Sequence, residues 1–462
     1  MEKPNYKLGH RSRVKENFLR HGADVFCDYE ILELLLFYTI PRRDTKGMAH
    51  ALMHEFVTLE AVLSASEEEL CRVDGIGPGT ARFLRSILPF ASYVLKQEAR
   101  PRAYKENKDV CKFFESFFSK NPDVPTAALL LDNSYQPLRL VRFDEISSIE
   151  GFANDVPTLV SQAYSVNAPM IVLAGHSFDQ ISSNIRLLSD VGHVLERELK
   201  DAGIVLLEIV QVNNGQATAL FRYMKGTLYE AGALDFIRHN DGEPVFGGTP
   251  EAKEKLREFL SLAIGKDPAQ NMTEHLLSVY PSILTASTVP YSTLTERDGV
   301  HSGGALLLRL ALDTYARAKE TSALKSGKPI RAARELGEMF SDAIGPRANE
   351  TMAVAALDSK MRLIAIKTFG EGTVNTAVFS YRSILEEVVR RGASYVAVAH
   401  NHPLGVTAPS SMDFQITADA KRLFECMKVT FLEHFVVTER EFLYTNRAIP
   451  NTDENIPEDF FK

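Results

Sequence analysis

The sequence predicts an α/β fold of the α+β kind, built by tandem duplication: a small helical module precedes an α-β-α module, and this pair occurs twice. Apolar residues in 1–104 follow the period of helices. Residues 105–232 alternate helical patterns with short apolar runs typical of buried strands. The same order of patterns returns after a Gly-rich linker at 239–249, which indicates a repeat.

Matching segments set the expected domain boundaries. Residues 298–309 match residues 74–85 at Asp, Gly, Ala, Leu and Arg positions, and the strand-like run 395–400 takes the place of 170–175. Chance similarity between two α/β domains would imitate part of this agreement. The expected segments are a helical module at 1–104, an α-β-α domain at 105–232, a second helical module at 250–327, a second α-β-α domain at 328–450 and an acidic tail at 451–462.

Periodicity also predicts individual elements. In the first half we expect helices at 29–40, 46–56, 66–73, 108–118, 158–164 and 181–202, a helix that begins at 78 or 80, and strands at 126–132, 138–144, 170–175 and 204–212. In the second half we expect strands at 351–358 and 395–400, a helix at 381–391 and a helix that begins at 409 or 410. Ser66 and Glu69 have the spacing of a capping box.

Composition narrows the class of protein. No apolar run in the 462 residues reaches the roughly 18 that a membrane span needs, and the N-terminal segment lacks the apolar stretch of a signal peptide. The four cysteines form no CxxC pair, which disfavours a disulfide framework and a thiolate zinc site and fits a reducing cytoplasm. The net charge of -8 argues against general polyanion binding. Basic residues nevertheless gather in the N-terminal arm, at Lys3, Lys7, Arg11, Arg13, Lys15 and Arg20.

A Gly-rich segment in the first helical module resembles a helix-hairpin-helix motif. In that motif two glycines let the backbone approach a phosphate, which the N–H groups at a helix start hold. On this interpretation Gly75, Gly77, Gly79 and Thr80 contact nucleic acid. A tight corner that only packs two helices explains the same glycines equally well. In the second module His301 takes the position of the second glycine, so we expect no phosphate contact there.

Two histidines and an aspartate concentrate ligand chemistry in the last domain. His400 and His402 lie two residues apart at the end of an expected strand, so their side chains point the same way. Ser410 opens an expected helix, and Asp413 lies one turn into it. Two imidazoles and a carboxylate are a standard ligand set for catalytic zinc, with one position left for water.

The reaction would also need a general base and a donor for an oxyanion. Glu350 is the best candidate for the base, and Ser410 can supply the donor. Simpler explanations stay open for each part. Ser410 and Asp413 have the spacing of a capping box, the two histidines can be polar residues at a strand end, and Glu350 can be a solvated charge. The joint pattern favours a metal site.

The pattern His400-x-His402-x7-Ser410-x2-Asp413, with Glu350 upstream, resembles the JAMM (MPN+) metallopeptidase motif and, within it, the bacterial RadC family. The resemblance covers nearly the whole chain as two tandem RadC-like units, and it implies a cytidine deaminase-like α-β-α fold. It implies a Zn2+ ion bound by His400, His402 and Asp413. It also implies that Glu350 is the general base and acid and that Ser410 stabilises the tetrahedral intermediate.

The chain departs from the family pattern in two places. RadC-like proteins usually have Ser-Gly-Asp after His-Asn-His-Pro, where this chain has Leu-Gly-Val at 404–406, which puts the substrate contacts in question but not the ligands. In the first copy the glutamate position falls near Val124, and Gly175 or Ser177 stands where a ligand beside His176 would be. We therefore expect no metal in the first copy.

Three functions follow from these patterns. The first is a zinc metallopeptidase that attacks an amide or isopeptide carbonyl of a protein or peptide substrate. The second is a DNA-associated, repair-type protein that contacts nucleic acid through its N-terminal module. The third is a scaffold in which the first α-β-α domain is a pseudo-enzyme paired with the second within the chain. We favour the first and expect no contact with membranes.

Overall fold

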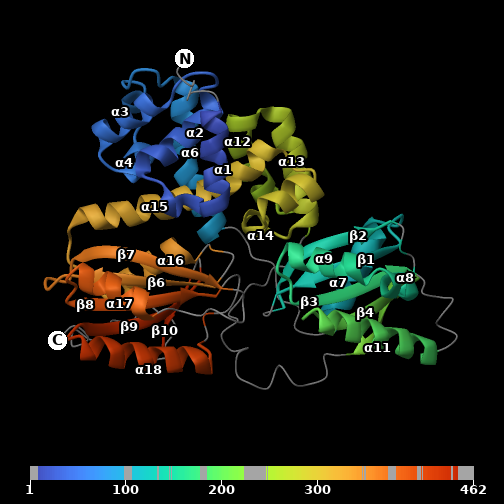
Figure 1. Ribbon diagram of the computed structural model, residues 1–462. Helices are drawn as coiled ribbons and strands as arrows, with labels where there is room; N and C mark the ends of the chain where they lie inside the picture. The colour runs from blue at the N-terminus through green and yellow to red at the C-terminus, as the bar shows by residue number, and fades with distance from the viewer. Residues whose placement is uncertain are drawn as a thin grey trace, which may run out of the picture. The chain divides into compact units, whose positions relative to one another are not determined.

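The computed structural model of the chain describes residues 9–97, 107–132, 135–144, 146, 148–176, 185–222, 246, 248–345, 347, 350–372, 381–402, 407, 409–438 and 441–445. The expected α/β fold is confirmed, because helices precede and flank two five-stranded mixed sheets (Figure 1). One compact unit comprises Met1–Glu98, Glu254–Met272 and Val300–Lys462, and the other comprises Ala99–Lys253 and Thr273–Gly299. The expected acidic tail lies outside the described residues.

The first unit begins with short helices, as the apolar spacing predicts. They are α1 (His10–His21), η1 (Gly22–Val25), α2 (Asp28–Thr39), α3 (Lys46–Phe56), α4 (Leu59–Ser64), α5 (Glu67–Leu70), α6 (Pro78–Ser92) and the turn η2 (Tyr93–Gln97). The capping box forms, with the Ser66 amide 2.8 Å from Glu69 Oε2 and the Glu69 amide 3.2 Å from Ser66 Oγ. The helix that it opens is shorter than expected and ends at Leu70.

Arg11, part of the basic N-terminal arm, binds the end of α2. Its guanidinium donates to the carbonyls of Ile40 at 2.7 Å and Arg43 at 2.6 Å, and it lies 4.6 Å from the centroid of the Phe37 ring. Carbonyls at a helix end lack partners within the helix, so a cation there stabilises the end. Packing inside the module therefore accounts for this basic residue without nucleic acid.

Two helices from the second half join this bundle: α12 (Pro250–Ile264) and α15 (Ser302–Ser326). Phe259 of α12 stacks on Phe90 of α6, with ring centroids 3.8 Å apart. The long helix α15 packs against α4 and α6 on one side and against α16 (Ala333–Ile344) and β7 (Leu363–Gly372) on the other (Figure 1). Helices far apart in the sequence thus lie together beside the second sheet.

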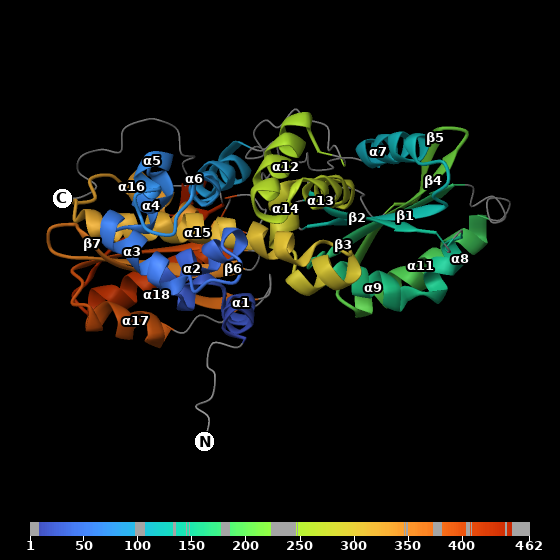
Figure 2. The same cartoon turned by 90° about the horizontal axis from the view of Figure 1, so that it is seen from above.

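The second unit contains the first sheet, with strand order β2-β1-β3-β4-β5. Its strands are β1 (Thr126–Leu131), β2 (Pro137–Phe143), β3 (Met170–His176), β4 (Val205–Asn213) and β5 (Gln216–Arg222). The helix α7 (Asn107–Lys120) covers one face and packs Phe114 and Phe118 onto the sheet. The other face is covered by α8 (Ile149–Asn154), α9 (Val156–Ser165) and α11 (Ile185–Asp201) (Figure 2).

A buried ion pair ties the remaining helical residues of this unit to β2. These residues belong to the end of α13 (Lys266–Val279), to α14 (Ile283–Thr288) and to the turn η4 (Thr293–Arg297). The Arg139 guanidinium of β2 pairs with Asp298, and the Tyr280 hydroxyl donates to the same carboxylate at 2.5 Å. Both charged side chains are less than a tenth exposed, so each charge is stabilised by its partner instead of by water.

The second sheet belongs to the first unit and has the order β10-β9-β8-β6-β7. Its other strands are β6 (Glu350–Leu357), β8 (Tyr395–Asn401), β9 (Thr430–Val437) and β10 (Phe442–Tyr444). On one face α16 buries Leu336 and Phe340 against the strands. On the other face α17 (Tyr381–Arg390) and α18 (Ser411–Cys426) bury Val388 and Phe424. The site described below stands at one end of this sheet.

The two sheets agree in strand order, direction and register. β1 is antiparallel to β2 and β3 as β6 is to β7 and β8, and β3–β4 and β8–β9 are the parallel pairs. Ala127 faces Ala174 in the first sheet, and Ala353 faces Ala399 in the second. This agreement supports the predicted duplication, which stays a prediction about the origin of the chain.

The turn after the first strand of each sheet is also the same. Asp132 Oδ1 accepts from the Gln136 amide at 2.9 Å, and Asp358 Oδ1 accepts from the Arg362 amide at 3.0 Å. This match agrees with the alignment of the two aspartates in the sequence. No helix in the described part of the chain is long and apolar enough to cross a bilayer.

Candidate metal centre

His400 and His402 stand at the C-terminal end of β8, as the strand pattern predicts. His400 is the penultimate residue of the strand and His402 follows its last residue, so the two-residue period directs both rings to one side. Their Nε2 atoms lie 3.0 Å apart. His400 is 2% exposed, whereas the His402 side chain is 23% exposed. One imidazole therefore belongs to the core and the other reaches toward solvent.

Asp413 joins the two histidines from the first turn of α18. Its Oδ1 lies 3.1 Å from His400 Nε2, and its Oδ2 lies 3.8 Å from His402 Nε2. Ser410 caps the same helix: its amide and its Oγ donate to Asp413 Oδ2 at 2.6 and 2.7 Å, and its Oγ accepts from the Asp413 amide. The capping box is confirmed, and it is compatible with the predicted ligand role of Asp413, because the cap holds the carboxylate beside His400.

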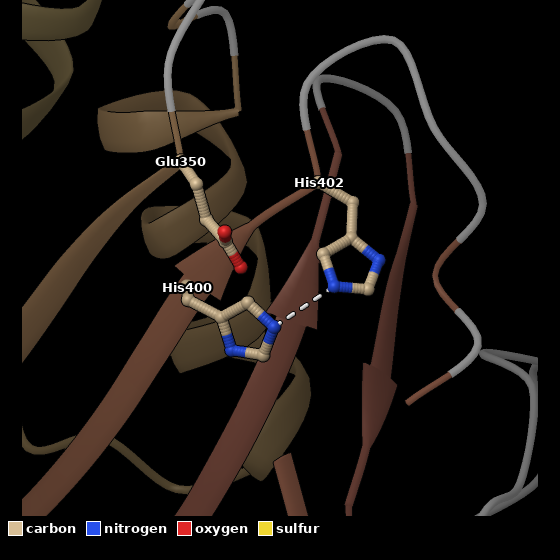
Figure 3. A group of neighbouring side chains, drawn as sticks. All are labelled: Glu350, His400 and His402. Atoms are coloured by element: carbon tan, nitrogen blue, oxygen red, sulfur yellow. Dashed lines mark hydrogen bonds between the residues drawn. The ribbon is translucent and has the colours of Figure 1, made fainter. Parts of the chain in front are cut away.

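Glu350, the first residue of β6, completes the group. A carboxylate oxygen of Glu350 and one nitrogen of each of His400 and His402 lie within 4.8 Å of one another. Figure 3 shows the carboxylate directed toward both imidazoles, from the strand next to β8 in the sheet. Glu350 is half-buried and is therefore not the solvated surface charge of the simpler explanation.

The donor set fits a zinc ion. Tetrahedral zinc with bonds of about 2.0–2.1 Å places its ligand atoms about 3.3 Å from one another. The separations of His400 Nε2 from His402 Nε2 and from Asp413 Oδ1 are close to that value, at 3.0 and 3.1 Å. Glu350 is a second carboxylate within 4.8 Å of the imidazole nitrogens, a separation at which it can act through a water molecule. The site can thus hold a metal with three protein ligands and one open position.

Burial dominates the electrostatics of the site. It lowers the pKa of His400, an effect that His402 reinforces and Asp413 opposes. Burial also raises the pKa of Glu350, which nearby His402 lowers and Asp413 raises further. A neutral imidazole is the form that binds a metal, and a carboxylate with a raised pKa takes up a proton more readily than an exposed glutamate. Both shifts suit the predicted roles of these residues.

Asn401 was not singled out from the sequence, although it lies between the two histidines. Its side chain is fully buried; Nδ2 donates to the Arg347 carbonyl at 3.0 Å, and Oδ1 accepts from the Thr351 amide at 2.7 Å. Because a strand alternates its faces, Asn401 points away from the metal ligands. It fastens the start of β6, and with it Glu350, to β8. Its place between two candidate ligands, inside the His-Asn-His-Pro run shared with RadC-like proteins, was the signal in the sequence.

His434 of β9 was missed as well. It is fully buried, and its Nε2 lies 2.8 Å from His400 Nδ1. Burial, followed by the neighbouring His400 and His402, lowers the pKa of His434 well below its ordinary value. A lone histidine inside an apolar strand carries no spacing signal, so sequence patterns could not have connected it to the site.

The corresponding end of the first sheet lacks these groups in the part that the structure describes. By register Val124 takes the place of Glu350, and Gly175 takes the place of His400. His176 packs its ring 4.4 Å from that of Phe118. Ser177 lies outside the described residues, as does the 404–406 segment near the candidate site. Absence of metal from the first copy stays a prediction.

The predicted nucleic-acid residues form the corner between α5 and α6. Gly75 has φ +85°, and a Cβ there would meet Met48 Sδ at 2.6 Å, so backbone and packing both require glycine. Gly77 caps α6, a Cβ at Gly79 would meet nothing, and Thr80 is buried. The packing explanation thus accounts for Gly75 and Thr80, and nucleic-acid contact stays a prediction.

The matching corner of the second module differs in the way the sequence suggests. Gly299 has φ +65° in the place of Gly75, and His301 caps α15. His301 Nδ1 accepts from the Gly304 amide at 3.3 Å. The imidazole thus accepts a hydrogen bond from one of the N–H groups that a bound phosphate would need.

Comparison with known proteins identifies one family model and several relatives. The family model described as RadC-like JAB domain matches residues 330–447. A UPF0758 protein of Fusobacterium nucleatum is 33% identical over 218 residues, covering 43% of this chain and 89% of the relative. UPF0758 proteins of Chromobacterium violaceum and Shewanella piezotolerans are 29% and 32% identical, covering 40% and 41% of this chain and 82% and 84% of the relatives. Each alignment thus spans most of the relative but less than half of this chain.

Proposed function

This chain belongs to the RadC family of JAB-domain proteins, and on that premise we propose that it is a zinc-dependent hydrolase of the JAMM type that cleaves an amide or isopeptide bond in a protein or peptide. The observation that carries the proposal is the convergence of His400, His402, Asp413 and Glu350 from two strands and a helix. The only group of this kind found in the described residues lies here.

His400, His402 and Asp413 would hold the ion. When bound, zinc polarises a carbonyl and lowers the pKa of a coordinated water to about 7, which supplies hydroxide at neutral pH. Ser410 keeps the Asp413 carboxylate turned toward His400 through two hydrogen bonds. The ligands thus have fixed positions before any substrate arrives.

Glu350 would move the proton. Its raised pKa lets the carboxylate take a proton from water near neutral pH and return it to the leaving amine. The Ser410 hydroxyl donates to Asp413 in this structure, so a bond from Ser410 to the tetrahedral intermediate requires that hydroxyl to rotate. We therefore propose Glu350 as the proton carrier and give Ser410 first the task of orienting Asp413.

Metal analysis of variants tests the proposal. We expect one zinc ion per wild-type chain after dialysis, loss of zinc in His402→Ala and Asp413→Ala, and full zinc in Glu350→Gln. Asp358→Ala is the matched control, because this aspartate of the same domain binds Arg362 in an exposed turn. Wild-type protein without stoichiometric zinc, or Asp413→Ala with wild-type zinc, would overturn the ligand assignment.

Hydrolysis should separate the ligands from the base. In an assay with a library of peptides and isopeptide-linked peptides, the wild type should cleave at least one class, and Glu350→Gln should be inactive although it retains zinc. Cleavage by Glu350→Gln at the wild-type rate would remove Glu350 from the mechanism.

The predicted cytoplasmic location agrees with free thiols at all four described cysteines.

The alternative functions keep their own tests. Contact with branched or nicked DNA through Gly75, Gly77, Gly79 and Thr80 should weaken steeply with salt. If the first α-β-α domain supports the second within the chain, a fragment from residue 250 onward should lose activity or solubility.

A further inference from the structure

A chain of hydrogen bonds leads from the rear of His400 back to the helix that carries Asp413. His400 Nδ1 lies 2.8 Å from His434 Nε2, and His434 Nδ1 lies 2.7 Å from Thr417 Oγ1. Thr417 Oγ1 lies 2.6 Å from the carbonyl oxygen of Asp413. All four residues are less than a tenth exposed, so bulk water does not compete for these bonds.

Each end of this chain meets an acceptor of Asp413: its carbonyl oxygen lies 2.6 Å from Thr417 Oγ1, and its carboxylate Oδ1 lies 3.1 Å from His400 Nε2. The shorter of these two contacts sets the order of the protons. A carbonyl oxygen only accepts, so the single hydroxyl proton of Thr417 is donated to Asp413. The Thr417 oxygen must then accept from His434, which places the proton of that imidazole on Nδ1. His434 Nε2 is left as an acceptor, and His400 must carry its own proton on Nδ1. His400 Nε2 then has a free lone pair.

The free lone pair faces the other candidate ligands. His400 Nε2 lies 3.0 Å from His402 Nε2 and 3.1 Å from Asp413 Oδ1. If every proton in the chain were reversed, Thr417 would donate to His434, and His400 Nε2 would hold a proton and donate it to Asp413 Oδ1. That nitrogen could not bind a metal, and the Asp413 carbonyl would lose the Thr417 proton.

We propose that Thr417 and His434 are positioning residues that hold His400 as its Nδ1–H tautomer and thereby present Nε2 to the metal. The inference rests on the proposed metal site, but it concerns protons that are in place before the metal binds. This chain of hydrogen bonds from His400 through His434 and Thr417 to Asp413, the relay, joins β8, β9 and α18. It therefore holds the strand that carries His400 against the helix that carries Asp413. Groups that orient a ligand in this way typically change metal affinity by about 10–100-fold when removed.

Thr417→Val tests the relay with little change in shape, because valine replaces the hydroxyl by a methyl group. We expect zinc affinity, measured by competition with a chromophoric chelator, to fall by about 10–100-fold. Thr417→Ser keeps the hydroxyl and should restore the affinity. The matched control is Thr321→Val, since Thr321 is also buried and its Oγ1 also donates to the carbonyl four residues earlier, at 2.9 Å, but it lies on α15 and contacts no member of the relay through that bond. Wild-type affinity in Thr417→Val, or equal losses in Thr417→Val and Thr321→Val, would overturn the proposal.

The tautomer can be observed directly in metal-free wild-type protein. With 15N-labelled histidine, long-range 1H–15N spectra should show protonated Nδ1 and unprotonated Nε2 for both His400 and His434, with assignment from His400→Gln and His434→Gln. Protonated Nε2 on His400 would overturn the proposal whatever the variants do. Wild-type protein that binds no zinc would refute the proposed function. The tautomers seen in these spectra would still show whether the relay places the protons as proposed.

Discussion

Replacement of Asn401 by alanine should destabilise the second sheet more than any surface change in the same domain. The side chain satisfies two backbone groups, the Thr351 amide at 2.7 Å and the Arg347 carbonyl at 3.0 Å. Each buried group left without a partner costs about 1–3 kcal/mol, so the two together cost about 2–6 kcal/mol. Water that enters the small space left by the amide recovers part of this, and we expect a net loss of about 2–4 kcal/mol.

Two measurements check this expectation. The chain has no tryptophan, so urea unfolding is best followed by circular dichroism. Hydrogen exchange read by mass spectrometry adds a local probe, because the Thr351 amide should lose protection while amides of the first sheet keep theirs. The control Asn121→Ala removes a single bond, from Nδ2 to the Phe117 carbonyl at the end of α7, and should cost about 1 kcal/mol or less.

The reasoning fails on a clear result. An Asn401→Ala protein with wild-type stability and unchanged exchange of the Thr351 amide would show that neither backbone group depends on this side chain. Asn401 would then have no part in fastening Glu350 to β8.

Three further predictions concern charge. Because burial raises the pKa of Glu350, the acidic limb of the pH profile of kcat/KM should have its midpoint above 4.5, the ordinary glutamate pKa. A midpoint at or below that value would contradict the role of Glu350 as base. In metal-free protein, burial keeps His400 and His434 neutral in the folded state, whereas both bind protons in the unfolded state below about pH 6.5. The free energy of unfolding therefore rises with pH through that range, and acidification removes about 1.4 kcal/mol per pH unit for each histidine. Urea unfolding at pH 5 to 7 that shows no such slope would refute it. Arg139→Ala should cost the second unit about 3–5 kcal/mol in the same assay by leaving the Asp298 carboxylate buried without its cation, and a loss below about 1 kcal/mol would show that the pair is dispensable.

Much of the fold follows from local patterns. The helix at 46–56 and the six strands that the periodicity predicts appear close to their expected positions, because the side-chain period reflects which face an element buries. The capping boxes at Ser66 and Ser410 form because their partners lie three residues apart in the chain. The helix α16 and the strands β5, β7, β9 and β10 were not predicted, although α16 has an amphipathic pattern that buries Leu336, Phe340 and Ile344.

The candidate site was predicted in part for the same reason. The strand period brings His400 and His402 together, and the helix cap places Asp413. Glu350 was named as the best candidate for the base ahead of a strand-like run, and the pairing of β6 with β8 brings it to the histidines. Neither the joint packing of the two helical modules nor the role of Arg11 at the end of α2 could be inferred from spacing.

The sequence by itself therefore determined what depends on neighbours in the chain: the order of helices and strands, the metal-ligand motif and the cap that orients Asp413. Only the tertiary structure decided which residues stand behind those ligands. Asn401 reaches Thr351 across 50 residues and His434 reaches His400 across 34, through strand pairings whose register no local period specifies. Such contacts depend on how the whole sheet assembles, and here they decide how the candidate base and the candidate ligand are held.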